Sequence, residues 1–144
     1  MAVSASICET FCVVIDTADA VKSLDTQTVD VGRSCQILFV QFTMVEGDNG
    51  STWQFQLRAD GTGAWEDMMG AVMPNKINNA QAVSQSGTNG SVPLIFVPTD
   101  YNTLTSPAGQ LRIVAGGGVG KDSSYVARFI CVAQTPASLP IVTT

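Results

Sequence analysis

The segment TWQFQLRADGTGAW, residues 52–65, decides the fold that this sequence predicts. Apolar and polar residues alternate along its first half, and a period of two is typical of a β-strand with one buried face. Trp53, Phe55, Leu57 and Ala59 alternate with the polar residues, and Trp53, Phe55 and Leu57 are expected in the core. Residues 60–63 tolerate a positive φ, so the chain is expected to turn back there. The opposite face carries amides, a hydroxyl and one arginine, and it suits contact better than chemistry.

Strand patterns recur at short spacing along the rest of the chain. They are predicted at residues 11–15, 26–31, 35–45, 80–85, 94–97, 111–115 and 125–133. No apolar period of 3.6 residues is sustained, and at most one helical turn is expected, near 18–21. The sequence therefore predicts an all-β, single-domain β-sandwich over residues 1–144, jelly-roll-like, with about eight strands and little or no helix. Residues 1–10 are expected to form an N-terminal arm and residues 135–144 an extended C-terminal tail.

The apolar run at 35–45 carries large side chains on both of its faces. Leu38, Val40, Phe42 and Met44 are expected on one face, with Ile37 and Phe39 on the other. This pattern indicates a strand that is covered on both sides, the second side by a neighbouring subunit. The segments 111–115 and 125–133 are expected to form a hairpin around the glycine-rich residues 116–122. The stretches 69–79 and 100–109 are expected to be loops.

Charged side chains are scarce in this chain. They make up 13% of the residues, with a net charge of −5, against roughly 25% in an average domain. We expect no nucleic-acid partner, because duplex affinity comes mainly from neutralising phosphates, and no anionic membrane partner for the same reason. No targeting segment or membrane span is recognised. Low charge is typical of a secreted protein or of one whose surface is covered in an assembly, and the missing leader favours an assembly.

The chain contains four cysteines, Cys8, Cys12, Cys35 and Cys131. A chain made in the cytoplasm normally keeps its thiols reduced. Cys35 and Cys131 lie within apolar strand patterns, where a free cysteine behaves as a small hydrophobe. Four free thiols are therefore expected, with a bridge involving Cys8 or Cys12 as the second reading and a Cys35–Cys131 bridge expected only in a secreted protein.

No constellation of residues predicts catalysis, a cofactor or a metal site, and the protein is not expected to be an enzyme. The chain has no histidine, which removes the commonest general base and the usual nucleophile pairs. Residues 115–122 resemble a phosphate loop, but Ala115 replaces its first glycine and Asp122 its hydroxyl residue. The oxygens at 46–49 lack the spacing of a calcium loop. Glu66 and Asp67 are adjacent in the chain, so in a strand they point to opposite faces.

The order of segments resembles that of the capsid-decoration (cement) proteins of tailed bacteriophages. Four features carry the resemblance: the strand end VDVG at 29–32, the long apolar strand at 37–45, the amide-rich strand and turn at 53–65, and the LR-apolar strand, glycine-rich turn and closing strand at 111–132. The central loops and the proline-containing tail depart from the family pattern.

The resemblance implies a jelly-roll protein without catalytic residues that decorates the outside of a phage head. It implies homotrimers that bind the major capsid protein and hold capsomers together, made in the host cytoplasm and located in the virion. Residues 2–10 and 135–144 are expected to reach a capsid subunit or a sister protomer. Gln54, Gln56 and Trp65 are the other contact candidates. The alternatives are another phage β-sandwich of the neck, tail or fibre, or a carbohydrate-binding module in which Trp65 and Tyr101 stack on sugars.

Overall fold

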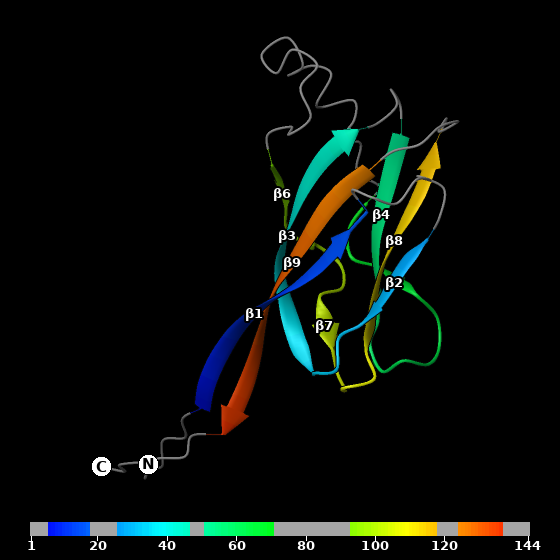
Figure 1. Ribbon diagram of the computed structural model, residues 1–144. Helices are drawn as coiled ribbons and strands as arrows, with labels where there is room; N and C mark the ends of the chain where they lie inside the picture. Colours follow the sequence, from blue (N-terminus) through cyan, green and yellow to red (C-terminus); the bar gives the residue numbers. More distant parts are fainter. Residues whose placement is uncertain (1–5, 18–25, 47–50, 71–92, 118–123, 137–144) are drawn as a thin grey trace.

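The protein is an all-β sandwich in which two antiparallel sheets lie face to face, as the sequence predicts (Figure 1). The computed structural model describes residues 6–17, 26–46, 51–70, 93–117 and 124–136. These residues contain nine strands and no helix, one strand more than the sequence suggests. The predicted strand at 80–85 and the helical turn near 18–21 lie outside the described residues.

Five strands form the first sheet, in the order β1-β9-β3-β6 with β7 also on β3. Their bounds are β1 Ser6–Asp16, β9 Ser124–Pro136, β3 Cys35–Glu46, β6 Leu94–Phe96 and β7 Thr103–Leu104. The second sheet has the order β2-β8-β4-β5. Its strands are β2 Gln27–Asp30, β8 Gln110–Gly117, β4 Ser51–Arg58 and β5 Glu66–Asp67. The short strand β7 lies within a segment expected to be a loop.

The strand pairs are nested along the chain. β1 pairs with β9, β2 with β8, β3 with β6 and β4 with β5, all antiparallel. Successive pairs belong alternately to the five-stranded and the four-stranded sheet. The chain is thus arranged as one long hairpin that is folded over into two layers. Each sheet consequently joins strands from the two halves of the sequence.

The core lies between the sheets and is centred on aromatic side chains. Trp53, Phe55 and Leu57 are buried, as the alternation at 52–59 predicts. Phe42 of β3 stacks on Tyr125 of β9 with ring centroids 5.1 Å apart, and it also lies 5.7 Å from the ring of Trp53. Aromatic pairs at such distances contribute beyond the area that they bury.

A β-bulge in β3 makes the predicted facial assignments of Ile37 and Leu38 wrong. The register with β9 shifts between Ile37 and Phe39, because Leu38 is an extra residue without a partner on β9. Ile37 and Val40 therefore both point into the core, while Leu38 is 41% exposed. The side chain of Met44 lies outside the described set. A prediction from strict alternation assumes that no residue is inserted, so it assigns the residues before the bulge to the wrong faces.

The predicted hairpin between 111–115 and 125–133 is also wrong. β8 pairs with β2 and β4, whereas β9 pairs with β1 and β3 in the other sheet. The link from β8 to β9 therefore crosses between the layers. Both strands are apolar on one face, and either sheet can bury such a face, so proximity in sequence did not identify the partner.

The turn predicted after β4 is confirmed, and it brings the chain back to pair β4 with β5. Gly61 and Gly63 have φ of 82° and 77°. A Cβ on Gly61 would lie 2.5 Å from the carbonyl oxygen of Ala108, whereas a Cβ on Gly63 would meet nothing within 4 Å. Gly61 thus permits close contact between this turn and the segment before β8.

This difference between two glycines of similar φ gives a matched test. Gly63→Ala should lower the free energy of unfolding by about 1–2 kcal/mol, the cost of a left-handed residue with a Cβ. Gly61→Ala should lower it by at least about 1 kcal/mol more, because the added methyl overlaps a backbone carbonyl. Urea unfolding of the two variants measures the difference. Equal losses would show that the turn yields freely and that the contact with Ala108 is unimportant.

Candidate interaction surfaces

The outer face of the five-stranded sheet carries a group of exposed apolar side chains. The strand register places two rows of outward-facing residues across it: Val14, Arg128, Gln41 and Ile95, and beside them Cys12, Ile130 and Phe39. Leu38 at the bulge and Val97 after β6 are also exposed. We call this surface the apolar face. Arg128 is the single charged residue in these two rows.

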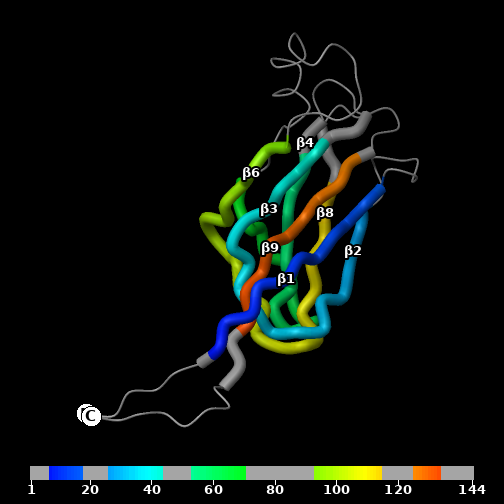
Figure 2. The backbone as a smooth tube through the Cα atoms, turned by 60° about the vertical axis from the view of Figure 1, so that its left-hand side comes forward, coloured from blue at the N-terminus to red at the C-terminus, as the bar shows by residue number. Residues whose placement is uncertain are grey.

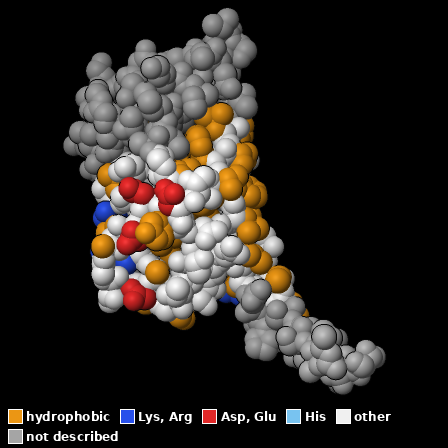
Figure 3. Space-filling view, turned by 180° about the vertical axis from the view of Figure 1, so that it is seen from behind, with side chains coloured by type: hydrophobic (Ala, Val, Ile, Leu, Met, Phe, Trp, Pro, Cys, Tyr) orange, Lys and Arg blue, Asp and Glu red, His pale blue; other side chains and the backbone are white. Residues whose placement is uncertain are grey.

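The exposure of the apolar face is high for side chains of this kind. Val14 is 47% exposed, Ile95 53% and Val97 61%. In Figure 3, hydrophobic side chains line the border of the molecule that leads down to its projecting end. Contiguous exposed apolar surface is uncommon on monomeric proteins and typically marks a contact with another protein. The sequence pattern at 35–45 had indicated such a covered second side.

A two-stranded ribbon projects from the sandwich and consists of residues 6–9 of β1 paired with residues 133–136 of β9 (Figures 1 and 2). Residues 6–9 belong to the expected N-terminal arm and residues 135–136 to the expected tail, and in the structure both are parts of strands. No third strand in the described part of the chain extends the sheet beside them. Isolated two-stranded ribbons are marginally stable in water, so a contact with another protein would stabilise this one.

Arg33 stabilises the base of the ribbon. Its Nη2 donates to Oε2 of Glu9 over 2.7 Å, and its guanidinium carbon lies 4.8 Å from the ring centroid of Phe11. The hydrogen bond and the positive charge of Arg33 hold the pKa of Glu9 below its usual value. The pair therefore covers the inner side of the ribbon where it leaves the core.

All four thiols are unpaired in the structure. Cys8 and Cys12 are both exposed on β1, and four strand residues separate their Cα atoms by about 13 Å. A Cys8–Cys12 bridge is excluded by that distance, since disulfides need Cα atoms within about 7 Å. Cys35 and Cys131 are buried, as predicted. The hydrogen bond with Cys35 and burial raise the pKa of the Cys131 thiol, which keeps it protonated at neutral pH.

The outer face of the four-stranded sheet is polar and joined by side-chain hydrogen bonds. Arg112 Nε donates to Oε1 of Gln56 over 2.7 Å, and Nε2 of Gln56 donates to Oδ1 of Asp67 over 2.6 Å. Beside them, Gln110 Nε2 donates to Oδ1 of Asp30 over 2.6 Å. Gln56, a predicted contact residue, is thus engaged with its neighbours. Gln54, the other, is half-buried next to Val114.

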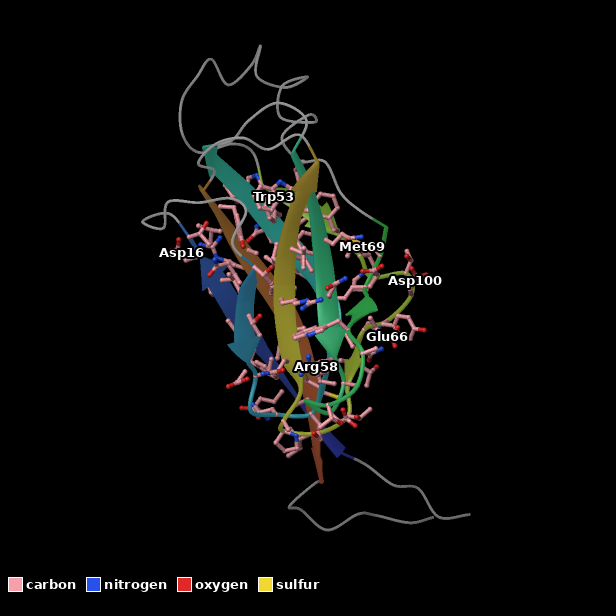
Figure 4. The ribbon with its side chains drawn as sticks, turned by 90° about the vertical axis from the view of Figure 1, so that its right-hand side faces the viewer. Asp16, Trp53, Arg58, Glu66, Met69 and Asp100 are labelled. Carbon is pink, nitrogen blue, oxygen red and sulfur yellow. The ribbon has the colours of Figure 1, made fainter. Side chains whose placement is uncertain are left out.

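Trp65 covers two arginines on this face. The guanidinium carbon of Arg58 lies 4.6 Å from the Trp65 ring centroid, and that of Arg112 lies 4.2 Å from it. Figure 4, in which the four-stranded sheet faces the viewer, places Arg58 low on β4 and Glu66 at the edge of the sheet, where it belongs to β5. Trp65 is half-buried, in agreement with the partial exposure expected for it. Burial and the charge of Arg58 lower the pKa of Arg112.

The two arginines were not predicted as site residues. Arg58 occupies an outward position in the alternation of β4, and Arg112 follows the same pattern in β8. A lone arginine on the polar face of a strand is ordinary, and only the pairing of β4 with β8 brings the two together. The return of Trp65 over them depends in turn on the Gly61 turn.

These contacts weaken one role that was considered for Trp65. A sugar stacks on a free aromatic face, but the Trp65 ring is already in contact with two guanidinium groups. Tyr101 is 49% exposed. No contact between Tyr101 and Trp65 is among the aromatic pairs of the described residues, and the two side chains are not brought together as a sugar platform.

Two further kinds of feature concern the described residues, metal-ligand groups and membrane-spanning helices. No group of three potential metal ligands occurs there, and none of their segments is a helix long and apolar enough to cross a bilayer. Most of the glycine-rich segment 115–122 and the acidic turn at 46–49 lie outside the described residues. The sequence matches no protein-family model, and no curated protein is significantly similar to it.

Proposed function

We propose that this protein is a structural component of a virus particle, a capsid-decoration protein that binds the outside of a phage head and stabilises contacts between capsomers. The observation that carries the proposal is the apolar face, where Val14, Leu38 and Ile95 are between 41% and 53% exposed. Such a surface on a sandwich with a closed core favours a permanent protein contact. The segment resemblance to phage cement proteins supports this choice among assembly proteins.

The connectivity of the strands supports the same proposal. Nested antiparallel pairs that alternate between two sheets correspond to the rolled-up hairpin of a jelly roll, and we propose that the fold is one. Jelly rolls are frequent in viral capsid proteins and also in lectins. Because one fold serves many functions, the surfaces carry more weight than the fold.

The two exposed surfaces would take different partners. The apolar face would pack against neighbouring copies in a homotrimer, because permanent interfaces between like subunits are the more apolar ones. The ribbon at 6–9 and 133–136 would reach the major capsid protein, since it extends beyond the sandwich. A contact along its free edges would add strands to it and remove its marginal stability.

A neck, tail or fibre-attached protein is the main alternative, and it would use the same surfaces. A carbohydrate-binding module has less support, because the two guanidinium groups already contact the ring of Trp65. The number of copies per particle distinguishes a decoration protein from a neck or tail protein. A decoration protein is present at a copy number comparable to that of the shell protein, whereas a neck or tail protein forms one small ring.

The proposal is tested on purified particles that contain this chain. Quantitative mass spectrometry should find it at a fixed, high ratio to the major shell protein. Particles stripped of it should lose resistance to heat and osmotic shock, and adding the purified protein back should restore that resistance. Particles that are equally stable without the protein would contradict the decoration role. A copy number as low as that of one small ring would indicate a neck or tail protein.

A further inference from the structure

We propose that Arg58 and Arg112 form an oxyanion-binding site whose ligand is the carboxylate of an acidic side chain on the protein to which this chain binds. The existence of the site is independent of the proposed function. Only the identity of the protein that supplies the carboxylate rests on the proposed function. The site lies on the four-stranded sheet, apart from the apolar face.

Two like charges are held together here by the fold. Arg58 pairs with Gln110 and Arg112 with Gln56 across β4 and β8, so the two arginines are diagonal neighbours on one face of the sheet. Both guanidinium groups also contact the Trp65 ring, at 4.6 and 4.2 Å. Their mutual repulsion is unfavourable, and an anion placed between them would relieve it.

Hydrogen-bond donors of Arg58 are not fully satisfied within the chain. Nε of Arg58 is buried and has no hydrogen-bond partner, and Nη1 makes a long bond of 3.3 Å to the Gly61 carbonyl. Neither arginine forms an ion pair within the described residues, where the single salt bridge joins Arg33 to Glu9. Because Nε of Arg58 is buried, a carboxylate from outside the chain would be bound by the Nη groups of the two arginines.

The neighbouring carboxylates do not fill this role. Asp60 accepts hydrogen bonds from the backbone N and the hydroxyl of Thr62, at 2.9 and 3.0 Å. Asp67 accepts a hydrogen bond from Gln56, which links it to Arg112, and its charge acts on that guanidinium without a direct hydrogen bond to it. No carboxylate of the described residues is hydrogen-bonded directly to either guanidinium group, so N–H groups of both remain for a carboxylate from outside the chain.

The chemistry of the site favours a carboxylate on a protein. The planar guanidinium fork matches a planar carboxylate with two parallel hydrogen bonds. Nucleic acid is disfavoured because the chain as a whole carries a net charge of −5. A cationic spot on an otherwise acidic protein would instead orient one acidic side chain of the partner and set the register of docking.

The site can be tested on the purified protein with acetate as the probe. Acetate is titrated against sodium chloride at equal ionic strength, and the Trp65 indole N–H signal is followed by NMR, with Trp65→Phe to assign it. The signal should shift saturably in the wild type. Arg112→Gln should abolish the shift, and Arg112→Lys, which keeps the charge but loses the fork, should weaken binding about tenfold or more.

Arg33→Gln is the matched control, because Arg33 also lies against an aromatic ring but already has a carboxylate partner. It removes the same charge and should leave the acetate affinity unchanged. Circular dichroism shows whether each variant is folded. If Arg112→Gln unfolds, the acetate affinity of Arg112→Lys tests the site in its place. A shift that does not saturate, or that persists equally in folded Arg112 variants, would overturn the site.

Particle binding then tests the carrier of the carboxylate. Arg112→Gln should bind stripped particles about tenfold or more weakly than the wild type, the cost of one charge-assisted contact. Equal binding by the variant would overturn the partner carboxylate while the acetate site stands. Failure of the wild type itself to bind particles would contradict the proposed function, and Arg112-dependent binding to single-stranded DNA would overturn a protein ligand.

Discussion

If the wild-type protein forms the proposed homotrimer, the double variant Val14→Glu/Ile95→Glu should be monomeric at the same concentrations. Both side chains lie in one row across the apolar face and are 47% and 53% exposed. The isolated fold should tolerate the carboxylates, whereas an apolar interface would bury them without a partner. A loss of about 2 kcal/mol or more at each central position corresponds to a dissociation constant raised more than about 100-fold. Sedimentation or light scattering over a concentration series measures the change.

Val114→Glu is the matched control for this experiment. It makes the same change of an apolar side chain to a carboxylate, on the outer face of the opposite sheet beside Gln54. Its solution mass should equal that of the wild type. If the wild type is monomeric at all accessible concentrations, or if the double variant assembles normally, the apolar face does not mediate self-association. Far-UV circular dichroism spectra of the three proteins should be the same, which separates loss of association from unfolding.

Phe42→Ala should cause the largest loss of folding stability among core variants of β3. The Phe42 ring lies within 5.1–5.7 Å of the rings of Tyr125, Phe55 and Trp53, so its removal leaves a cavity at the junction of both sheets. Large-to-small substitutions of buried phenylalanine cost about 3–5 kcal/mol, a large share of the roughly 5–15 kcal/mol that stabilises a typical domain. Urea unfolding in the Val14→Glu/Ile95→Glu background measures it without a contribution from association.

Tyr101→Ala is the comparison for the core variant, because it removes an aromatic ring that is 49% exposed. Its free energy of unfolding should stay within about 0.5 kcal/mol of the parent value. Phe42→Leu should fall between the two, since it keeps most of the apolar volume. A loss below about 1 kcal/mol for Phe42→Ala would mean that the aromatic cluster repacks and does not stabilise the sandwich as its geometry indicates.

Local alternation was sufficient to predict the class of fold. Trp53, Phe55 and Leu57 could be assigned to the core because side chains of a strand alternate between two faces whatever the strand pairs with. The turn at 60–63 could be predicted because glycine tolerates the positive φ found at Gly61 and Gly63. The burial of Cys35 and Cys131 followed from the apolar residues around them.

The pairing of strands was decided by the tertiary structure. The predicted hairpin between 111–115 and 125–133 failed because antiparallel partners are chosen by long-range packing, and in this chain they lie as far apart as Ser6 and Pro136. The bulge at Leu38 was not predicted because it is a feature of the pairing between two strands. One inserted residue exchanges the faces on which the residues before and after it lie.

The apolar character of one sheet could be read in outline from the sequence, since residues 37–40 are apolar on both faces. The cluster of Arg58, Arg112 and Trp65 could not, because its members come from two strands and a loop that meet only through the β4–β8 pairing and the return of the chain at Gly61. The sequence alone thus determined which residues of a regular strand face inward, because that depends on the geometry of a single strand. The tertiary structure decided which outward-facing residues become neighbours, because that depends on contacts between strands distant in the chain.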